Sequence, residues 1–243
     1  MYFYHVFLVV IILFIQSTAY SQPLPNSVAD SLITEQTKLY STIECSNFFD
    51  SAGFIKGYVS PFQGSKIRNP FFQENNWRNG SLNLGGKTYL VDMMKYNIEM
   101  DQLIVLISMK SEAYPIAINS TSIPQFHFDG KDFFYLDSIL WPGYYEKIST
   151  KSCNIYVKWY KRLLNNQTRG EVYSLHQKIV IEKEGNFYAI HRLADLYKLF
   201  PSVENEMRKY KKEHNIIFSK NPSGAVYQLV GLANTILTEN EVN

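Results

Sequence analysis

Three turn dipeptides punctuate the stretch from residue 80 to residue 190, and they constrain the fold more than any other feature of the chain. Gly85-Gly86, Asp129-Gly130 and Glu184-Gly185 each separate two runs of apolar and β-branched residues. Glycine, and to a lesser degree aspartate, tolerates the positive φ angles of the tight turns that close β-hairpins. The spacing therefore predicts antiparallel strands joined by short turns.

The same pattern predicts more hairpins than these three. One is expected around the polar residues Glu99 and Asp101, and another between the runs 143–148 and 154–164. The segment Leu103–Ile107 is apolar at every position, so this strand should be buried on both faces. About nine strands in all are expected to form an antiparallel β-meander, either a sheet or an open barrel.

The hydrophobic period changes after the last expected strand. Apolar residues recur at helical spacing over 193–200, and Pro201 ends that segment. Ser202 and Ser223 are expected to cap two further helices. Because helices occupy about 192–238 and follow the strands, the predicted architecture is α+β, a β-meander with a small C-terminal helical segment.

The N-terminal segment is predicted to be a signal peptide. Residues 1–21 contain no Asp, Glu, Lys or Arg, and apart from His5 they are almost purely apolar up to Ile15. Ala19 and Ser21 are small residues at the two positions that a signal peptidase recognises. Cleavage would leave residues 22–243, which we expect to form a single β-rich domain. The alternative is an uncleaved N-terminal anchor. No later segment approaches about 18 uninterrupted apolar residues, so the mature chain is not expected to span a membrane.

Composition and motifs exclude several classes of function. The 24 Lys+Arg residues nearly balance the 22 Asp+Glu residues, so the chain lacks the basic excess of a nucleic-acid-binding protein. A hydrophobic content of 46% excludes intrinsic disorder. The sequence contains no CxxC, no HExxH and no Gly-x-Ser-x-Gly. We therefore predict no metal site, no cofactor and no catalytic residue.

The two cysteines, Cys45 and Cys153, lie far apart in the sequence. In an oxidising compartment they could form a disulfide, which would stabilise the fold by about 3–5 kcal/mol through the entropy of the unfolded chain. The alternative is two separate, partly buried thiols.

Two acidic pairs are the nearest approach to a catalytic constellation. Glu99 with Asp101 and Asp129 with Asp132 both fall in expected turns, where solvated side chains are the ordinary interpretation. A glycosidase requires two carboxylates set across a cleft, which spacing along the chain does not show.

Aromatic residues make up 15% of the chain. Five of them are our candidate ligand-binding residues, namely Trp77, Tyr144, Tyr145, Trp159 and Tyr160. If exposed, they would offer a sugar or a protein partner a large contact area with a polar edge. If buried, they would pack in the β-rich core, which is the commoner role of aromatic residues in strands.

An ordered series of aromatic and glycine positions extends through most of the mature chain. Its segments are Lys38–Tyr40, Gly57–Val59, Asn69–Phe72, Trp77–Leu82, Gly86–Tyr89, Met94–Asn97, Asp101–Val105, Gly143–Tyr145, Lys158–Arg162 and Asn186–Tyr188. The series resembles a group of uncharacterised exported proteins of Gram-negative bacteria from the Bacteroidota lineage. The resemblance implies compartment and lineage, and it transfers no catalytic residue. The group has Tyr-Asp where this chain has Tyr96-Asn97, a departure that weakens the case for an acidic site.

These observations predict an exported cell-envelope protein, periplasmic or secreted, that acts as a non-enzymatic binding or structural module. Its expected partner is a glycan or an envelope protein. The alternative is a glycan- or peptide-directed hydrolase, which would need at least two carboxylates of perturbed pKa converging across a cleft.

Overall fold

The computed structural model describes residues 69–109, 112–118, 122–137, 139–166 and 170–242. All of them belong to one compact unit, 41–243. The predicted signal peptide (1–21) and Cys45 lie outside the described residues.

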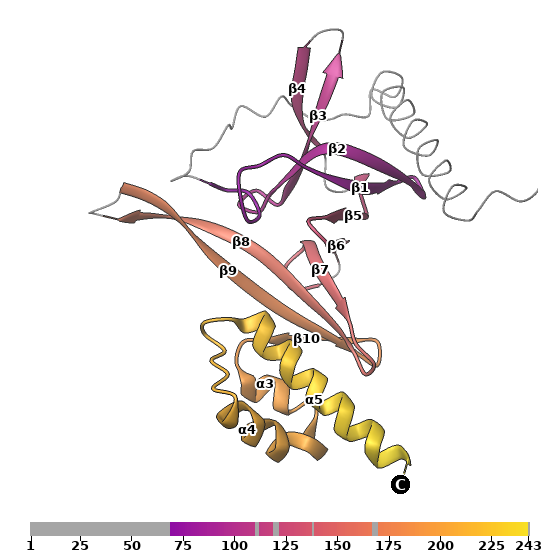
Figure 1. Ribbon diagram of the computed structural model, residues 1–243, viewed down its shortest axis with the longest axis vertical. Helices are drawn as coiled ribbons and strands as arrows, with labels where there is room; N and C mark the ends of the chain where they lie inside the picture. The colour runs from indigo at the N-terminus through magenta and orange to yellow at the C-terminus, as the bar shows by residue number, and fades with distance from the viewer. Residues whose placement is uncertain (1–68, 110–111, 119–121, 138, 167–169, 243) are drawn as a thin grey trace, which may run out of the picture. The chain divides into compact units, whose positions relative to one another are not determined.

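Ten antiparallel strands form one open sheet in the order β10-β9-β8-β7-β6-β5-β1-β2-β3-β4, so that β10 and β4 are its edges (Figure 1). The strands are β1 (Arg78–Leu84), β2 (Lys87–Asn97), β3 (Gln102–Met109), β4 (Glu112–Ile118), β5 (Gln125–Phe128), β6 (Lys131–Leu136), β7 (Gly143–Ser149), β8 (Asn154–Asn166), β9 (Gly170–Lys183) and β10 (Asn186–Ile190). The predicted open antiparallel sheet is confirmed, but it is not a single meander. The chain crosses over after β4, so that β5 pairs with β1 and joins two runs of consecutive strands, β1 to β4 and β5 to β10.

The three predicted turns close the hairpins β1–β2, β5–β6 and β9–β10. Both central residues of each turn have positive φ, between 53° and 81°. This is the backbone geometry of a type I′ turn, whose twist matches that of the flanking strands. Asp-Gly and Gly-Gly were thus correct signals of hairpin position.

The strand count differs from the predicted nine because β4 is additional. The sequence pattern missed β4 because Pro115 lies within its apolar run, and proline argues against a strand. The structure resolves this conflict by placing β4 at the edge of the sheet, where it pairs with β3 alone. At an edge, a strand can lack one N–H donor without breaking the sheet.

Helices follow the sheet, as predicted, but their starts differ. They are α3 (Leu193–Tyr197), the 3₁₀ turn η2 (Pro201–Val203), α4 (Glu204–Glu213) and α5 (Pro222–Val242). Ser202 does not cap α4, because it lies inside η2 and the cap position is Val203. Ser223 does not cap α5 either, since Pro222 begins that helix and the Asn221 side chain accepts from the N–H of Gly224.

The side chains alternate between two faces of the sheet, as they must along extended strands. One face, the core face, carries Leu82, Phe126, Phe133 and Tyr144 in a cluster of buried side chains that extends from β1 to β7. The other, the outer face, carries residues at the alternating positions, such as Tyr145 beside Phe134.

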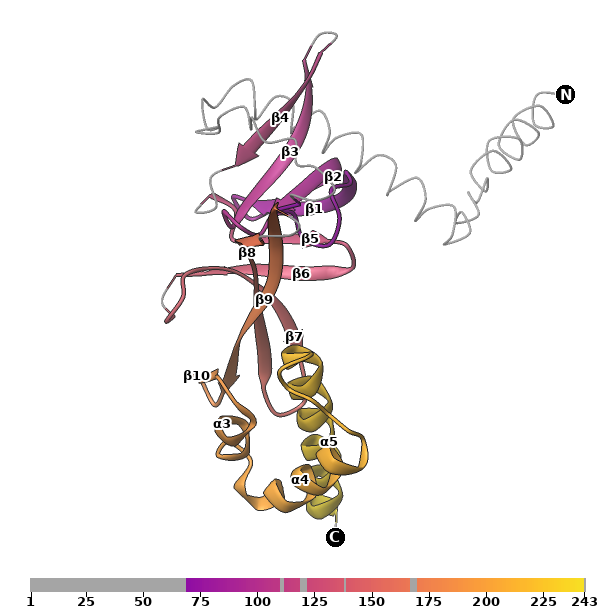
Figure 2. The same ribbon diagram turned by 90° about the vertical axis from the view of Figure 1, so that its left-hand side faces the viewer.

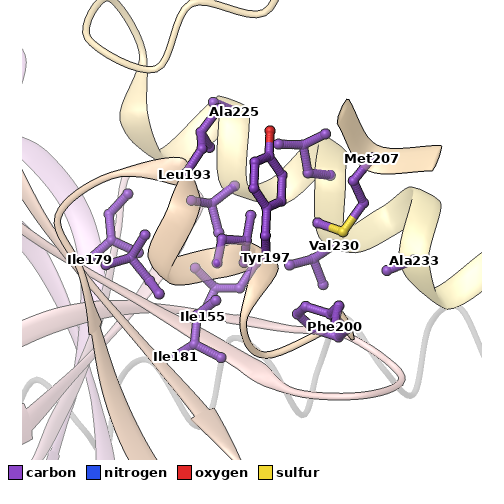
Figure 3. Close-up of a cluster of buried hydrophobic side chains, with 14 of the residues drawn as sticks. Ile155, Ile179, Ile181, Leu193, Tyr197, Phe200, Met207, Ala225, Val230 and Ala233 are labelled. Atoms are coloured by element: carbon purple, nitrogen blue, oxygen red, sulfur yellow. The ribbon is translucent and has the colours of Figure 1, made fainter. Parts of the chain in front are cut away.

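A second core lies between β8, β9 and β10 and the three helices, which gather at this end of the sheet in both views (Figures 1 and 2). Figure 3 shows Tyr197 lying between the isoleucines of the strands and Val230 of α5, and Phe200 belongs to the same buried cluster. The half-buried Trp159 contacts both cores and so joins them. Within the described residues, no helix is long and apolar enough to cross a membrane.

Candidate binding surface

The outer face of β7, β8 and β9 carries aromatic rings next to cationic side chains. The strand register explains this arrangement, because Lys158 of β8 lies opposite Lys178 of β9, and Tyr160 opposite His176. The loop before β7 adds Trp141, which packs against the small outer cluster of Tyr145, Tyr156 and Val180. We call this region the aromatic–cation surface: Trp141, Lys147, Tyr156, Lys158, Tyr160, Arg162 and Lys178.

Six cation–π contacts fix the positions of these cations. The Lys178 ammonium lies 4.4 Å from the ring centre of Trp141 and 5.5 Å from that of Tyr160. The Arg162 guanidinium lies 5.3 Å from the same Tyr160 ring. His176 stacks on Tyr160 at 5.2 Å. The Tyr160 ring therefore contacts two cations, and each contact contributes about 0.5–1 kcal/mol when exposed.

The charges on this surface are unevenly balanced. Lys158 binds the carboxylate of Asp101 at 2.5 Å, whereas no carboxylate of the described residues lies within ion-pair distance of Lys178 or Arg162. Burial lowers the pKa of Lys178, and the neighbouring charges of Lys158 and Arg162 lower it further. The surface thus concentrates positive charge around Tyr160.

Asp101 positions Lys158 from a turn that is distant in sequence. It follows β2 at positive φ, and its carboxylate accepts hydrogen bonds from the Tyr96 hydroxyl (2.5 Å) and the Tyr144 backbone N–H (3.1 Å). Gly143 makes room for this contact, because a Cβ atom there would lie 1.8 Å from the Asp101 carboxylate and 2.1 Å from the Lys158 ammonium. The predicted turn residue Asp101 is therefore a structural anchor.

A second carboxylate borders the surface. Glu182 of β9 accepts hydrogen bonds from Asn154 (2.9 Å) and the Tyr156 hydroxyl (3.0 Å). These bonds, with a smaller contribution from Lys147, lower the pKa of Glu182 against the opposing effect of burial. Burial and the bond to Glu182 raise the pKa of Tyr156 to about 12. Glu182 is therefore ionised and engaged at neutral pH.

The structure does not bring the five predicted aromatic residues together on one exposed face. Tyr144 and Tyr145 are fully buried and donate to the backbone oxygens of Ile123 and Trp141. Trp159 lies on the core face, where its indole N–H donates to the buried Glu146 at 2.7 Å. Tyr160 is half-buried within the aromatic–cation surface.

Trp77, the fifth predicted residue, lines a groove of about 800 Å³ on β1, β2 and β5. The Lys95 ammonium lies 4.5 Å from its ring centre. Arg78 and Asp129 in the same groove bind each other, and His127 binds Asp132 at 2.8 Å. These charged groups of the groove are thus already paired with opposite charges within the protein.

Each acid of the two predicted pairs is engaged by another side chain. Asp101 is bound to Lys158 and Asp129 to Arg78, while Glu99 accepts from the Tyr173 hydroxyl. A general acid would need a raised carboxyl pKa, whereas the shifts at Glu182 and Asp195 are downward. The described residues also contain no cluster of His, Cys, Asp and Glu able to hold a metal ion.

Cys153 is buried and lies 3.5 Å from the Thr150 hydroxyl, and it forms no disulfide with another described residue. Its predicted partner, Cys45, lies outside the described residues, so the disulfide stays a prediction.

Sequence reasoning missed Trp141, Arg162 and Lys178, although a signal for the surface was present. Alternate positions of β8 read Tyr156, Lys158, Tyr160 and Arg162, so one face of this strand alternates aromatic and basic residues. Residues two apart in a strand lie on the same face, so the alternation of aromatic and basic residues at these positions would have indicated such a surface.

Comparison of the chain with family models, with curated proteins and with solved structures found no significant match.

Proposed function

We propose that this chain is an exported, non-enzymatic binding module of the cell envelope, and that its aromatic–cation surface contacts an envelope glycan. The observation that carries the proposal is the set of six cation–π contacts on the outer face of β7 to β9 and the loop before β7, one of which extends to the Phe134 ring of β6. Core packing does not account for the three contacts made by Trp141 and Tyr160, because Trp141, Tyr160 and Lys178 are half-buried rather than covered.

Binding fits this surface better than catalysis. Aromatic rings offer apolar contact area to the C–H groups of a sugar ring, and neighbouring polar groups fix its orientation. The acidic side chains near the surface are engaged in structural bonds, Asp101 with Lys158 and Glu182 with Asn154. No described carboxylate pair offers the acid and base that glycoside hydrolysis requires.

The binding half of the proposal is tested with an array of bacterial envelope glycans. Combining Trp141→Ala with Tyr160→Ala should abolish most of the signal given by the exported wild-type protein. The matched control is Tyr227→Ala, which removes a ring that is 54% exposed on α5, away from the surface. Equal signals from the double variant and the control would contradict the proposal, provided that thermal unfolding shows both to be folded.

The export half is tested by the mass of the protein recovered from the producing cells. The predicted cleavage gives a soluble extracytoplasmic chain beginning at Gln22. Recovery of full-length protein with Met1 retained in the inner membrane would contradict it.

A further inference from the structure

We infer that the ligand of the aromatic–cation surface is an acidic polysaccharide, whose carboxylate or sulfate groups bind Arg162 and Lys178. This inference rests on the proposed function, and it adds the chemical class of the ligand.

The first step is the charge of the surface. Four cations, Lys147, Lys158, Arg162 and Lys178, lie on the outer face of β7 to β9. The two carboxylates that contact this surface, Asp101 and Glu182, are each bound within the protein. Arg162 and Lys178 have no carboxylate of the described residues within ion-pair distance. Lys178 is half-buried, and the neighbouring charges of Lys158 and Arg162 act on it. An anion bound beside Lys178 offsets this repulsion.

The second step is the fixed position of the two cations. Both lie within 5.5 Å of the Tyr160 ring centre, and Lys178 also lies 4.4 Å from the ring centre of Trp141. Long basic side chains normally lose rotamer freedom when they bind a ligand, at about 1 kcal/mol or more each. Here the rings have already restricted them. The site is therefore arranged for an anion before the ligand arrives.

The third step distinguishes a polysaccharide from other polyanions. The cations are accompanied by Trp141 and Tyr160, whose half-buried rings add apolar contact next to the charges. An acidic sugar unit combines both features, since its ring has C–H groups and its substituent is anionic. An acidic peptide lacks the rigid C–H surface. The positive charge is also local, because the whole chain has a net charge of only +2, which does not favour general binding to nucleic acid.

The test is titration calorimetry of the exported protein with defined hexasaccharides. Hexagalacturonate and a heparin hexasaccharide supply carboxylate and sulfate groups, and fully methyl-esterified hexagalacturonate is the neutral counterpart. A glutamate hexamer supplies the same charge without sugar rings. The key variant combines Arg162→Gln with Lys178→Gln. Its matched control combines Lys211→Gln with Lys212→Gln, which removes the same charge from α4.

We expect at least one acidic hexasaccharide to bind the wild-type protein and the control equally. The Arg162→Gln/Lys178→Gln variant should bind it about tenfold or more weakly, as expected for lost hydrogen bonds to charged groups. The neutral ester and the glutamate hexamer should also bind more weakly. Affinity for the acidic hexasaccharide should fall as the salt concentration rises.

Four results would overturn the inference. Equal binding by the key variant and the control would remove Arg162 and Lys178 from the site. If the glutamate hexamer binds as tightly as the acidic hexasaccharide, the surface recognises negative charge alone and not a sugar. If the neutral ester binds as tightly as the acid, and only the Trp141→Ala/Tyr160→Ala variant loses affinity, the ligand class is wrong but the proposed function stands. Failure of every glycan, on the envelope array as well, would contradict both.

Discussion

Replacing Asp101 by asparagine should destabilise the protein, because this carboxylate connects three strands. It follows β2, binds Lys158 of β8, and accepts from the backbone N–H of Tyr144 in β7. The Asp101→Asn variant keeps the shape of the side chain but removes the charge and one acceptor oxygen. The Lys158 ammonium then retains the Pro142 carbonyl at 3.0 Å, and the Tyr96 hydroxyl competes with the Tyr144 N–H for one oxygen.

The magnitude follows from the burial of the pair. The side chains of Lys158 and Asp101 are 12% and 24% exposed, so water compensates poorly for the lost partner. Breaking a buried ion pair costs about 3–5 kcal/mol, and the residual exposure of this pair places it near the lower end. With a urea dependence of about 2 kcal/mol/M, the unfolding midpoint should fall by about 1.5 M.

Urea unfolding followed by tryptophan fluorescence measures this shift. The matched control is Asp132→Asn, whose carboxylate binds His127 with both side chains about half exposed. An exposed pair contributes little, so its midpoint should move by about 0.3 M or less. In a double-mutant cycle, Asp101→Asn combined with Lys158→Met should cost less than the sum of the single changes. Equal shifts for Asp101→Asn and Asp132→Asn, or strict additivity in the cycle, would refute the reasoning.

Two further predictions concern stability. Gly143→Ala should destabilise the protein more than Gly130→Ala in thermal unfolding. Both residues have positive φ, but only at Gly143 would the new Cβ meet Asp101 and Lys158. The Gly130 change should cost about 1–2 kcal/mol, and equal losses of stability in the two variants would contradict the account. Stability should also fall as the pH rises above about 10, because burial raises the folded pKa of Tyr156 to about 12 and those of Tyr144 and Tyr145 further. A tyrosine whose folded pKa is raised contributes stability that is complete below its unfolded pKa of about 10 and is lost at higher pH. Absorbance titration at 295 nm should therefore show these tyrosines ionising only with unfolding, and a single transition near pH 10 in the folded protein would contradict this.

Local signals predicted the sheet well because each hairpin is determined by its own turn. Asp129-Gly130 needs positive φ at both residues, a requirement that the two residues satisfy without help from distant contacts. The edge strand β4 was missed for the opposite reason. Whether Pro115 is tolerated depends on its place in the sheet order, which is a property of the whole fold.

The helix starts were wrong for a related reason. Ser202 and Ser223 are good capping residues, but neither takes that role. Pro201 begins a 3₁₀ turn that includes Ser202. The Asn221 side chain accepts a hydrogen bond from the Gly224 N–H at the start of the last helix. Pro201 and Asn221 are both visible in the sequence beside the two serines. The preference of a residue type for the cap position does not by itself show which of two neighbouring residues begins the helix.

The candidate surface was less accessible to sequence reasoning than the fold. Tyr160 was chosen for its ring alone. Its partner Lys178 comes from another strand, and the second ring that Lys178 contacts, Trp141, comes from a loop. Register determines these contacts, and register is not visible in one strand. Tyr144 and Tyr145 looked equivalent to Tyr160 in the sequence, yet their positions in β7 bury both.

Backbone NMR mapping of the acidic hexasaccharide that binds best tests the central claim most directly. Titration of the ¹⁵N-labelled protein should shift the Trp141 indole resonance and the backbone amides of residues 158–162 and 176–178, while those of α5 stay in place. Shifts confined to the Trp77 groove or to α5, or no shift at all at millimolar hexasaccharide, would contradict the assignment of the aromatic–cation surface as the ligand-binding face.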